Sequence, residues 1–247
     1  MAVIQGITEW LPISSTGHLV LAQAAMGIPV PAAFDVVLHI GTLLSILYFM
    51  RNELTGLAKS AMKREREGVR LVSFVVLGTL PAALMGFLFK AYFESLVGSV
   101  YVVATGLLFS GLLLFLSEMK VRNGQLDGGK SLAIGMMQAI AIIPGVSRSG
   151  ATISCGLMLG VKKETAARFS FLLSIPVVVG AMLLELGGLA NSQIDPLLVL
   201  TGVIVSAAVG YASLKLLWNT ILARKFHLFA YYCWAVALLV MLPQMLI

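Results

Sequence analysis

The segment QGITEWLPISSTGH at residues 5–18 has a counterpart, QAIAIIPGVSRSGAT, at residues 138–152. Gln5 lies 133 positions before Gln138, and the same interval separates Ser14 from Ser147. Each copy is an apolar run broken by proline, then a turn rich in hydroxyls and glycine, then a second apolar run. Ionisable side chains are costly inside a membrane, so their presence in two matched breaks indicates a functional site rather than a relic of duplication.

The composition of the chain excludes a soluble domain. Of the 247 residues, 59% are hydrophobic and 11% are charged, and the mean hydropathy is +0.98. Apolar stretches long enough to cross a bilayer recur along the chain and predict six transmembrane helices. We place these spans at residues 34–50, 71–89, 99–117, 169–187, 197–217 and 229–247.

The two matched segments are too short to be spans. Eleven residues precede Pro12, and the stretches 131–143 and 152–160 fall below the roughly 20 residues that a span needs. Irregular backbone at membrane depth is tolerated only where it is buried in protein or lines a polar cavity. We therefore expect each segment to form the tip of a re-entrant helical hairpin.

Lysine and arginine residues predict the orientation of the spans. They gather in the connections 51–70 and 118–130 and at the ends of later spans on the same side. By the positive-inside rule this side is cytoplasmic, which leaves the connections 28–33, 90–98 and 188–196 and both termini outside. The net charge of +6 then reflects orientation, and we expect no nucleic-acid partner. The basic residues of this side are Arg51, Lys59, Lys63, Arg64, Arg66, Arg70, Lys120, Arg122, Lys130, Lys162, Lys163, Arg168, Lys215, Arg224 and Lys225.

This orientation gives the two halves of the chain opposite topology, because the first hairpin returns outside and the second returns inside. The predicted fold is an all-α integral membrane protein with six transmembrane helices plus two re-entrant helical hairpins, arranged as an inverted-topology repeat. We treat residues 1–247 as a single membrane domain. Repeat one covers about 1–117, a basic cytoplasmic connection covers 118–130, and repeat two covers about 131–247.

The hydroxyl-rich turns come directly before helices, where side chains cap free backbone N–H groups. A helix start suits phosphate, because it offers those N–H groups and the positive end of the helix dipole. Arg148 adds a fixed charge whose forked donors match phosphate oxygens. At this depth Arg148 needs a partner, either Glu9 or a bound phosphate, and an ion pair without a chemical role is the alternative. The capping candidates are Ser14, Ser15, Thr16, Ser147 and Ser149.

Gln5 and Glu9 lie one helical turn apart and can face the same cavity. Glu9 is a candidate general base or a ligand of a hard divalent cation, whereas Gln5 equally suits a hydrogen bond between helices. His18 follows Ser15 by three positions, which places a base on the same helical face as a candidate nucleophile. The alternative for His18 is a hydrogen bond to a backbone carbonyl.

The motifs QGITEWLPISSTGH and PGVSRSGAT resemble those of the undecaprenyl-diphosphate phosphatase family, also called bacitracin-resistance proteins. The likeness extends to FDVVLHIGTLLS at 34–45 and FSFLLSIP at 169–176, and it covers essentially the whole chain. The resemblance implies an integral membrane phosphatase that removes the terminal phosphate of undecaprenyl diphosphate. That reaction recycles the lipid carrier of peptidoglycan synthesis in the bacterial plasma (inner) membrane and confers bacitracin resistance.

The resemblance also implies roles for particular residues. The family's E/Q-x-x-x-E element falls on Gln5 and Glu9, with the amide at its first position, and implies a divalent cation there, Mg²⁺ or Ca²⁺. The family's catalytic serine and histidine match Ser15 and His18, and Arg148 matches its phosphate-binding arginine. The residues expected to bind the substrate phosphates are Ser14, Thr16, Gly17, Ser147, Ser149, Gly150 and Thr152.

Two mechanisms and one rival function remain open on these residues. Ser15 attacks the terminal phosphorus while His18 or Glu9 takes its proton, or a water attacks directly with Glu9 as the base. The rival is a transporter or flippase of a prenyl-phosphate lipid carrier, since inverted repeats with broken helices are common in transporters. The expected partners are the polyprenyl diphosphate substrate and membrane lipids, with a homodimer left open.

Overall fold

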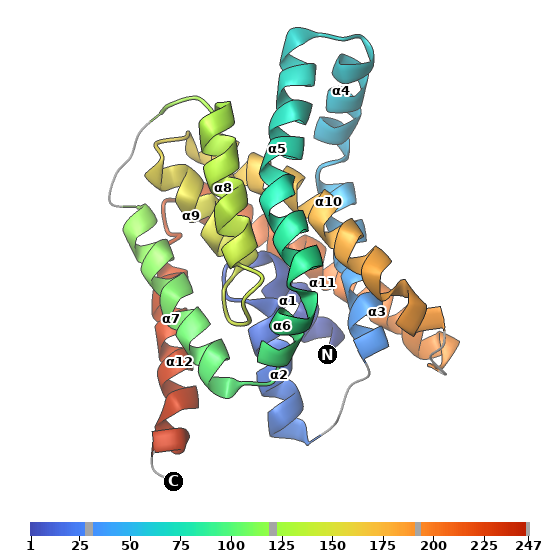
Figure 1. The fold of residues 1–247 in the computed structure, drawn as a ribbon, viewed down its shortest axis with the longest axis vertical. Coiled ribbons are helices and arrows are strands. Elements are labelled where there is room, and N and C mark those ends of the chain that lie inside the picture. The colour runs from blue at the N-terminus through green and yellow to red at the C-terminus, as the bar shows by residue number, and fades with distance from the viewer. Residues whose placement is uncertain (28–31, 119–122, 191–193, 246–247) are drawn as a thin grey trace.

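A computed structural model describes residues 1–27, 32–118, 123–190 and 194–245, without the side chains of residue 32 and of residues 185–190 and 243–245. The described residues are all-helical, as predicted, with twelve α-helices and one isolated bridge between Gly124 and Val161 (Figure 1). The helices are α1 Ala2–Trp10, α2 Ser15–Met26, α3 Ala32–Phe49, α4 Arg51–Met62, α5 Arg66–Leu88, α6 Lys90–Leu96, α7 Val100–Ser117, α8 Gly128–Ile140, α9 Arg148–Met158, α10 Lys163–Ala190, α11 Pro196–Leu222 and α12 Leu228–Met245.

Each of the six predicted spans falls on a helix, namely α3, α5, α7, α10, α11 or α12. Within the described residues, four of these are long and apolar enough to cross a membrane: α5, α7, α10 and α11. A fifth candidate is the pair α3–α4, which bends by 71° and is either a broken span or a re-entrant element. The described apolar part of α12, Leu228–Leu242, is shorter. The chain is therefore a multi-pass membrane protein.

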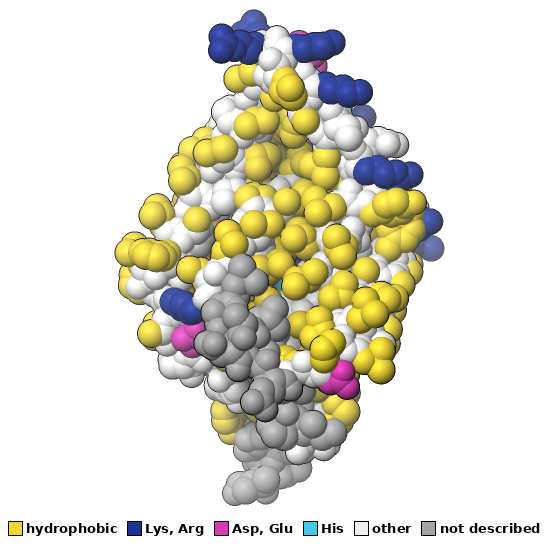
Figure 2. Space-filling view, turned by 90° about the vertical axis from the view of Figure 1, so that its right-hand side faces the viewer, with side chains coloured by type: hydrophobic (Ala, Val, Ile, Leu, Met, Phe, Trp, Pro, Cys, Tyr) yellow, Lys and Arg dark blue, Asp and Glu magenta, His cyan; other side chains and the backbone are white. Residues whose placement is uncertain are grey.

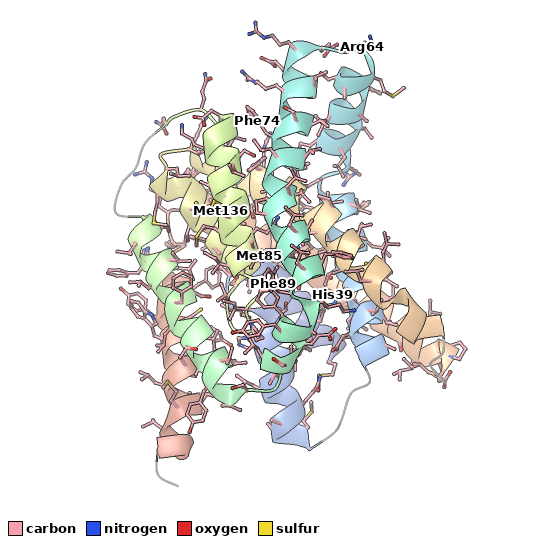
Figure 3. The ribbon with its side chains drawn as sticks, in the orientation of Figure 1. His39, Arg64, Phe74, Met85, Phe89 and Met136 are labelled. Carbon is pink, nitrogen blue, oxygen red and sulfur yellow. The ribbon has the colours of Figure 1, made fainter. Side chains whose placement is uncertain are left out.

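The outer surface suits lipid. Figure 2 shows one face on which hydrophobic side chains form a broad band, with lysine and arginine side chains gathered toward one end. Met85 on α5, Phe89 directly after α5 and Met136 on α8 (Figure 3) are among the exposed large hydrophobic residues of the molecule. In water such a surface would be an aggregation liability, whereas in a bilayer it is the expected lipid contact.

Two predicted connections contain helices of their own. The basic connection 51–70 is mostly helical, because α4 continues to Met62 and α5 begins at Arg66. The outer connection 90–98 contains the short helix α6. The connection 118–130 ends sooner than predicted, because Asp127 accepts a hydrogen bond from the backbone N–H of Lys130 at 2.9 Å and caps α8. Parts of the connections 28–33 and 188–196, and the basic residues Lys120 and Arg122, lie outside the described residues.

The two sequence copies form two broken helical pairs, the first hairpin (α1 and α2) and the second hairpin (α8 and α9). In the first, α1 ends before Pro12, because a residue that precedes proline disfavours helical backbone. Ser14 then caps α2 by accepting a hydrogen bond from the N–H of Gly17 at 3.3 Å. In the second, Ser147 caps α9 through the N–H of Gly150 at 3.1 Å. The predicted caps at Ser14 and Ser147 are confirmed.

The breaks of the two hairpins contact each other. A Cβ placed on Gly17 would lie 3.4 Å from the Cα of Gly145, and one on Gly150 would lie 3.2 Å from the Cβ of Pro12. From this contact α2 extends toward one end of the molecule, and the second hairpin extends toward the end where α4 meets α5 (Figure 1). The surroundings also match, because α1 packs along α11 while α8 packs along α5. The two breaks therefore share one interior location.

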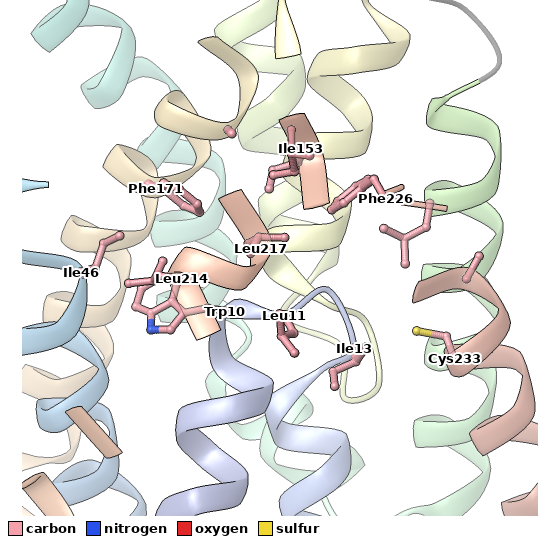
Figure 4. Packing of buried hydrophobic residues seen from close by; sticks show 14 of the residues in the cluster. Trp10, Leu11, Ile13, Ile46, Ile153, Phe171, Leu214, Leu217, Phe226 and Cys233 are labelled. Carbon is pink, nitrogen blue, oxygen red and sulfur yellow. The ribbon is translucent and has the colours of Figure 1, made fainter. Parts of the chain in front are cut away.

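The hydrophobic core surrounds this location. Trp10 from α1 is buried with Phe171 from α10 and with Leu214 and Leu217 from α11 (Figure 4). The rings of Trp10 and Phe171 meet edge to face, with centroids 6.4 Å apart. Leu11 and Ile13, on either side of Pro12, are buried in the same cluster. The packing therefore fixes the position of the first break.

Candidate active site between the two hairpins

A pocket of about 220 Å³ opens where the two breaks meet. Six of the predicted site residues line it: Glu9, Ser14, Ser15, Thr16, Ser147 and Arg148. Its other walls come from α1, α3, α8, the break between α8 and α9, and α10, through Thr8, His39, Gln138, Ala141, Ile142, Val146, Val177, Val178 and Ala181. The pocket therefore combines charged groups and hydroxyls from both hairpins with an apolar rim.

The carboxylate of Glu9 is the centre of the polar contacts. Its Oε2 accepts hydrogen bonds from Ser15 Oγ at 2.7 Å and from Gln5 Nε2 at 3.1 Å. Its Oε1 pairs with the guanidinium of Arg148. The Glu9 side chain is only 6% exposed, so these contacts replace most of its hydration. Glu9 therefore contacts the hydroxyl of Ser15 on the other side of the first break and the guanidinium of Arg148 from the second hairpin.

Arg148 stands at the first position of α9, immediately after its cap. Besides Glu9, it donates a hydrogen bond to the backbone carbonyl of Ser174 at 3.3 Å. The indole ring of Trp10 lies 5.7 Å from the centre of the guanidinium, within range of a cation–π contact. Of the two partners predicted for Arg148, the structure shows Glu9. The guanidinium of Arg148 thus contacts two residues of α1, Glu9 and Trp10, and one residue of α10, Ser174.

Hydroxyl groups from both helix starts complete the polar wall. Ser14 has a positive φ of 69°, a conformation that is uncommon for a residue with a side chain and that concentrates at functional sites. Opposite it, the N–H of Ser147 donates to Ser110 Oγ at 2.9 Å, which ties the second break to α7. The first turns of α2 and α9 thus present backbone N–H groups and hydroxyls at the pocket, an arrangement that suits an anion.

His18 lies elsewhere than the helical-face argument predicted. Its Nδ1 bonds to the backbone carbonyl of Ser14 at 2.8 Å, and its Nε2 bonds to the hydroxyl of Tyr232 at 2.8 Å. Its ring stacks on Tyr232 with centroids 5.7 Å apart. Both ring nitrogens are thus engaged away from Ser15, and His18 is not a lining residue of the pocket. The carbonyl contact arises because residue i−4 of a helix presents its C=O to the side chain at i.

Five further predicted residues lie behind the pocket wall rather than on it: Gln5, Gly17, Ser149, Gly150 and Thr152. The hydroxyl of Thr152 bonds to Ser170 Oγ at 2.6 Å and donates to the carbonyl of Arg148 at 2.8 Å. Ser149 Oγ lies 3.3 Å from Ser147 Oγ. These groups hold the start of α9 in place, and the two glycines permit the close approach of the breaks.

Nine of the lining residues were not among the predicted site residues, and two of these, His39 and Gln138, bring an imidazole and an amide to the pocket. His39 on α3 (Figure 3) points its Nε2 toward Glu9 Oε2, at 3.9 Å, while its Nδ1 contacts the carbonyl of Asp35 at 2.7 Å. Gln138 on α8 is 2% exposed and faces the same pocket. Its relation to Gln5 in the repeat was the available signal for Gln138. For His39 the signal is its spacing of four positions from Asp35 at the start of the predicted span 34–50, which allows the two residues either to extend the site or to form an interfacial pair, and the structure places His39 at the pocket.

A divalent cation would find few protein ligands here. No group of three or more His, Cys, Asp or Glu side chains suited to a metal occurs in the part of the chain that the structure describes. Glu9 is the carboxylate of the pocket, and the buried Oε1 of the adjacent Gln5 has no hydrogen-bond partner among the described residues. This pair of oxygens fits Mg²⁺ only where a substrate supplies further oxygens, because Mg²⁺ takes six ligands and often binds through one or two carboxylates plus phosphates.

The fold and the site define a multi-pass helical membrane protein with a buried site of paired charges and hydroxyls between two broken hairpins. The family model "Bacitracin resistance protein BacA" matches residues 1–239. Proteins named undecaprenyl-diphosphatase are similar over nearly their whole length. The relative from Methanobrevibacter smithii is 38% identical over 97% of this chain and 94% of its own, and that from Rubrobacter xylanophilus is 39% identical over the same shares. The relative from Desulfosudis oleivorans is 41% identical over 94% of this chain and 92% of its own. The chain belongs to the bacitracin resistance protein BacA family.

Proposed function

We propose that this protein is an undecaprenyl-diphosphatase, which converts undecaprenyl diphosphate to undecaprenyl phosphate and inorganic phosphate. The observation that carries the proposal is the contact of Ser15 Oγ with Glu9 Oε2 at 2.7 Å, beside a paired Arg148 in a buried pocket. A hydroxyl held against a base, next to a forked cation, suits attack on a phosphoanhydride. Relatives that carry this enzyme name, at 38–41% identity, support the same activity. Its role is to recycle the lipid carrier, and bacitracin resistance follows from it.

The substrate binds by exchanging partners with Arg148. Arg148 and Glu9 are paired across the two hairpins, so each charge compensates the other within the protein. A diphosphate offers Arg148 two forked acceptors and draws it from the carboxylate. The N–H groups and hydroxyls at the starts of α2 and α9 bind the remaining oxygens, with Ser14, Thr16 and Ser147 on the pocket wall. Glu9 keeps its contacts to Ser15 and Gln5.

The chemical step then uses Ser15 and Glu9. Ser15 Oγ forms a bond to the terminal phosphorus while the bond from that phosphorus to the bridging oxygen breaks. The proton of Ser15 passes to Glu9, which delivers it to the departing prenyl monophosphate. Water then attacks the phosphoserine, and Glu9 takes a proton from the water and returns it to Ser15. Direct attack by a water held by Glu9 is the alternative, and the two differ in whether a phosphoserine forms.

A divalent cation has a supporting place in this scheme. Glu9 on the pocket wall would hold it from the protein side, Gln5 directly behind Glu9 would be a second ligand, and the diphosphate would supply further oxygens. When bound, Mg²⁺ or Ca²⁺ neutralises part of the phosphate charge. The buried Oε1 of Gln5, which has no hydrogen-bond partner in the described part of the chain, supports this assignment.

For the membrane arrangement we propose six spans and two re-entrant hairpins in a single domain of inverted repeats. The support is the interval of 133 residues and the matching of α1 on α11 with α8 on α5. The basic end that includes the α4–α5 turn faces the cytoplasm, and both termini face outward, in the plasma membrane. Two half-helix starts then meet near the bilayer midplane, where the prenyl chain can remain in lipid while its diphosphate enters the pocket.

Release of phosphate by purified protein tests the proposed activity. The protein in detergent micelles receives undecaprenyl diphosphate with Mg²⁺, and free phosphate is measured over time. We expect multiple turnovers in the wild type and none in Glu9→Gln. Uptake or exchange of the lipid across vesicles without any phosphate release would instead identify a transporter of the carrier and overturn the proposal.

A further inference from the structure

Gln138 is a buried amide that forms no hydrogen bond with the residues that the structure describes. It is 2% exposed and lines the pocket between the hairpins. Neither its Nε2 nor its Oε1 has a hydrogen-bond partner among the described residues. An amide buried without a hydrogen-bond partner is costly, because burial removes its hydrogen bonds to water and nothing replaces them. Such a group calls for an explanation.

The comparison with Gln5, its counterpart in the first copy, explains why Gln138 is free. Gln5 donates to Glu9, the residue four positions further along α1. Four positions after Gln138 stands Ile142, which offers no acceptor. The carboxylate is thus present in one copy only. Gln138 therefore has an amide at the pocket but no acceptor one helical turn further on, so its donor is available to a ligand.

We infer that Gln138 is a substrate-binding residue, whose amide Nε2 donates a hydrogen bond to a phosphate oxygen of the bound diphosphate. This inference rests on the proposed function. The pocket already holds the charges of Glu9 and Arg148, and a second cation would be buried without a partner in the absence of substrate. A neutral donor avoids that cost and still satisfies an anionic oxygen when the diphosphate arrives. Gln138 thus extends the binding surface onto α8, beyond the helix starts.

The test is the affinity of purified variants for a prenyl methylenediphosphonate, a diphosphate that cannot be cleaved. We expect Gln138→Leu to raise its Kd by roughly ten- to a hundredfold, the effect of losing a hydrogen bond to a charged group. The melting temperature of Gln138→Leu without ligand should not fall, because the variant removes an unsatisfied amide. If the Leu variant does not fold, Gln138→Met preserves the length of the side chain. Gln138→Glu should bind more weakly still, since it places a second negative charge against the phosphates.

The matched control is Ser154→Ala on α9. Ser154 is also fully buried, with an Oγ that lacks a partner among the described residues, but it does not line the pocket. Its variant should bind the diphosphonate like the wild type. A Kd for Gln138→Leu or Gln138→Met within twofold of the wild type overturns the inference, and so does tighter binding by Gln138→Glu. Wild-type protein that binds the diphosphonate but releases no phosphate would refute the proposed activity alone.

Discussion

Arg148 and Glu9 come from different hairpins, 139 positions apart, and form the ion pair on which the pocket is built. Each group would be costly to bury alone, and each leaves the other with uncompensated charge if it is removed. The pair also carries the proposed chemistry, since one member meets phosphate and the other meets Ser15. Stability and turnover therefore depend on the same two side chains but in separable ways.

The first residue-level prediction concerns the fork of Arg148. Arg148→Ala should reduce turnover by roughly a thousandfold or more, the range for an arginine that stabilises a transferring phosphoryl group. Arg148→Lys should recover little of that loss, because a point charge does not reproduce two parallel donors. Steady-state phosphate release measures both, with Arg168→Lys at an exposed arginine as the control. Near-normal activity in Arg148→Lys would exclude a pair of parallel hydrogen bonds from the guanidinium to the phosphate as the role of Arg148.

The second prediction separates the structural role of the pair from its chemical role. Glu9→Gln should lower the free energy of unfolding by roughly 3–5 kcal/mol, because it leaves Arg148 buried without a counter-charge. The double variant Glu9→Gln/Arg148→Met should regain much of that stability, since neither charge remains. Both variants should release no phosphate. Thermal unfolding in detergent gives the first comparison, and equal stability of the single and double variants would refute the coupling.

At the scale of elements, the break in each hairpin decides which side chains meet. The chain reverses at Pro12, so Ser15 on α2 faces back toward Glu9 on α1 and contacts it at 2.7 Å. Helical spacing alone predicts that His18, three positions after Ser15 on the same helix, is the base beside Ser15. In the structure Ser15 contacts Glu9 across the chain reversal, whereas the two ring nitrogens of His18, one turn further along α2, bond to Ser14 and Tyr232.

The sequence therefore predicted the elements better than the contacts. The two hairpins, the caps at Ser14 and Ser147 and a partner for Arg148 follow from proline positions, hydroxyl positions and the cost of a buried charge. The approach of His39 to Glu9 and the hydrogen bond between His18 and Tyr232 depend on how helices distant in the sequence pack. No local pattern encodes that packing, so these contacts required the three-dimensional structure.

A prediction at this scale concerns Gly145, at the second break. Its φ is +91°, and a Cβ there would lie 2.2 Å from the carbonyl oxygen of Val103. Gly145→Ala should therefore displace the break from α7 and lower the free energy of unfolding by about 3 kcal/mol, the upper range for overpacking. Gly98→Ala is the control, because its φ is +96° but nothing lies within 4 Å, so only backbone strain of about 1 kcal/mol is expected. Similar melting temperatures in the two variants would contradict the steric argument.

At the scale of the whole molecule, the distribution of charge relates the pocket to the membrane. The α4–α5 turn carries basic residues at one end of the molecule, and the band of exposed hydrophobic side chains lies between the ends (Figure 2). From their contact, α2 and the second hairpin extend toward opposite ends of the molecule (Figure 1). A site at the meeting point can receive a charged head group while the attached chain stays in lipid.

The orientation gives a fourth prediction. With Lys63→Cys on the α4–α5 turn and Ser95→Cys on α6, a membrane-impermeant maleimide should label only Ser95→Cys in intact cells. Lys63→Cys should react after the membrane is permeabilised. The native Cys155 and Cys233 are buried, so the unsubstituted protein serves as the background. Strong labelling of Lys63→Cys in intact cells would reverse the assigned sides.

The most direct test of the whole account is the turnover of Ser15→Ala compared with Ser14→Ala. Ser15→Ala should lose nearly all phosphate release from undecaprenyl diphosphate while still binding its methylenediphosphonate, because Arg148 and the second hairpin remain. Ser14→Ala should lose far less, since it removes a helix cap worth about 1 kcal/mol. A Ser15→Ala enzyme that keeps more than about a tenth of wild-type turnover, a barrier change of only ~1.4 kcal/mol, would contradict attack by this hydroxyl.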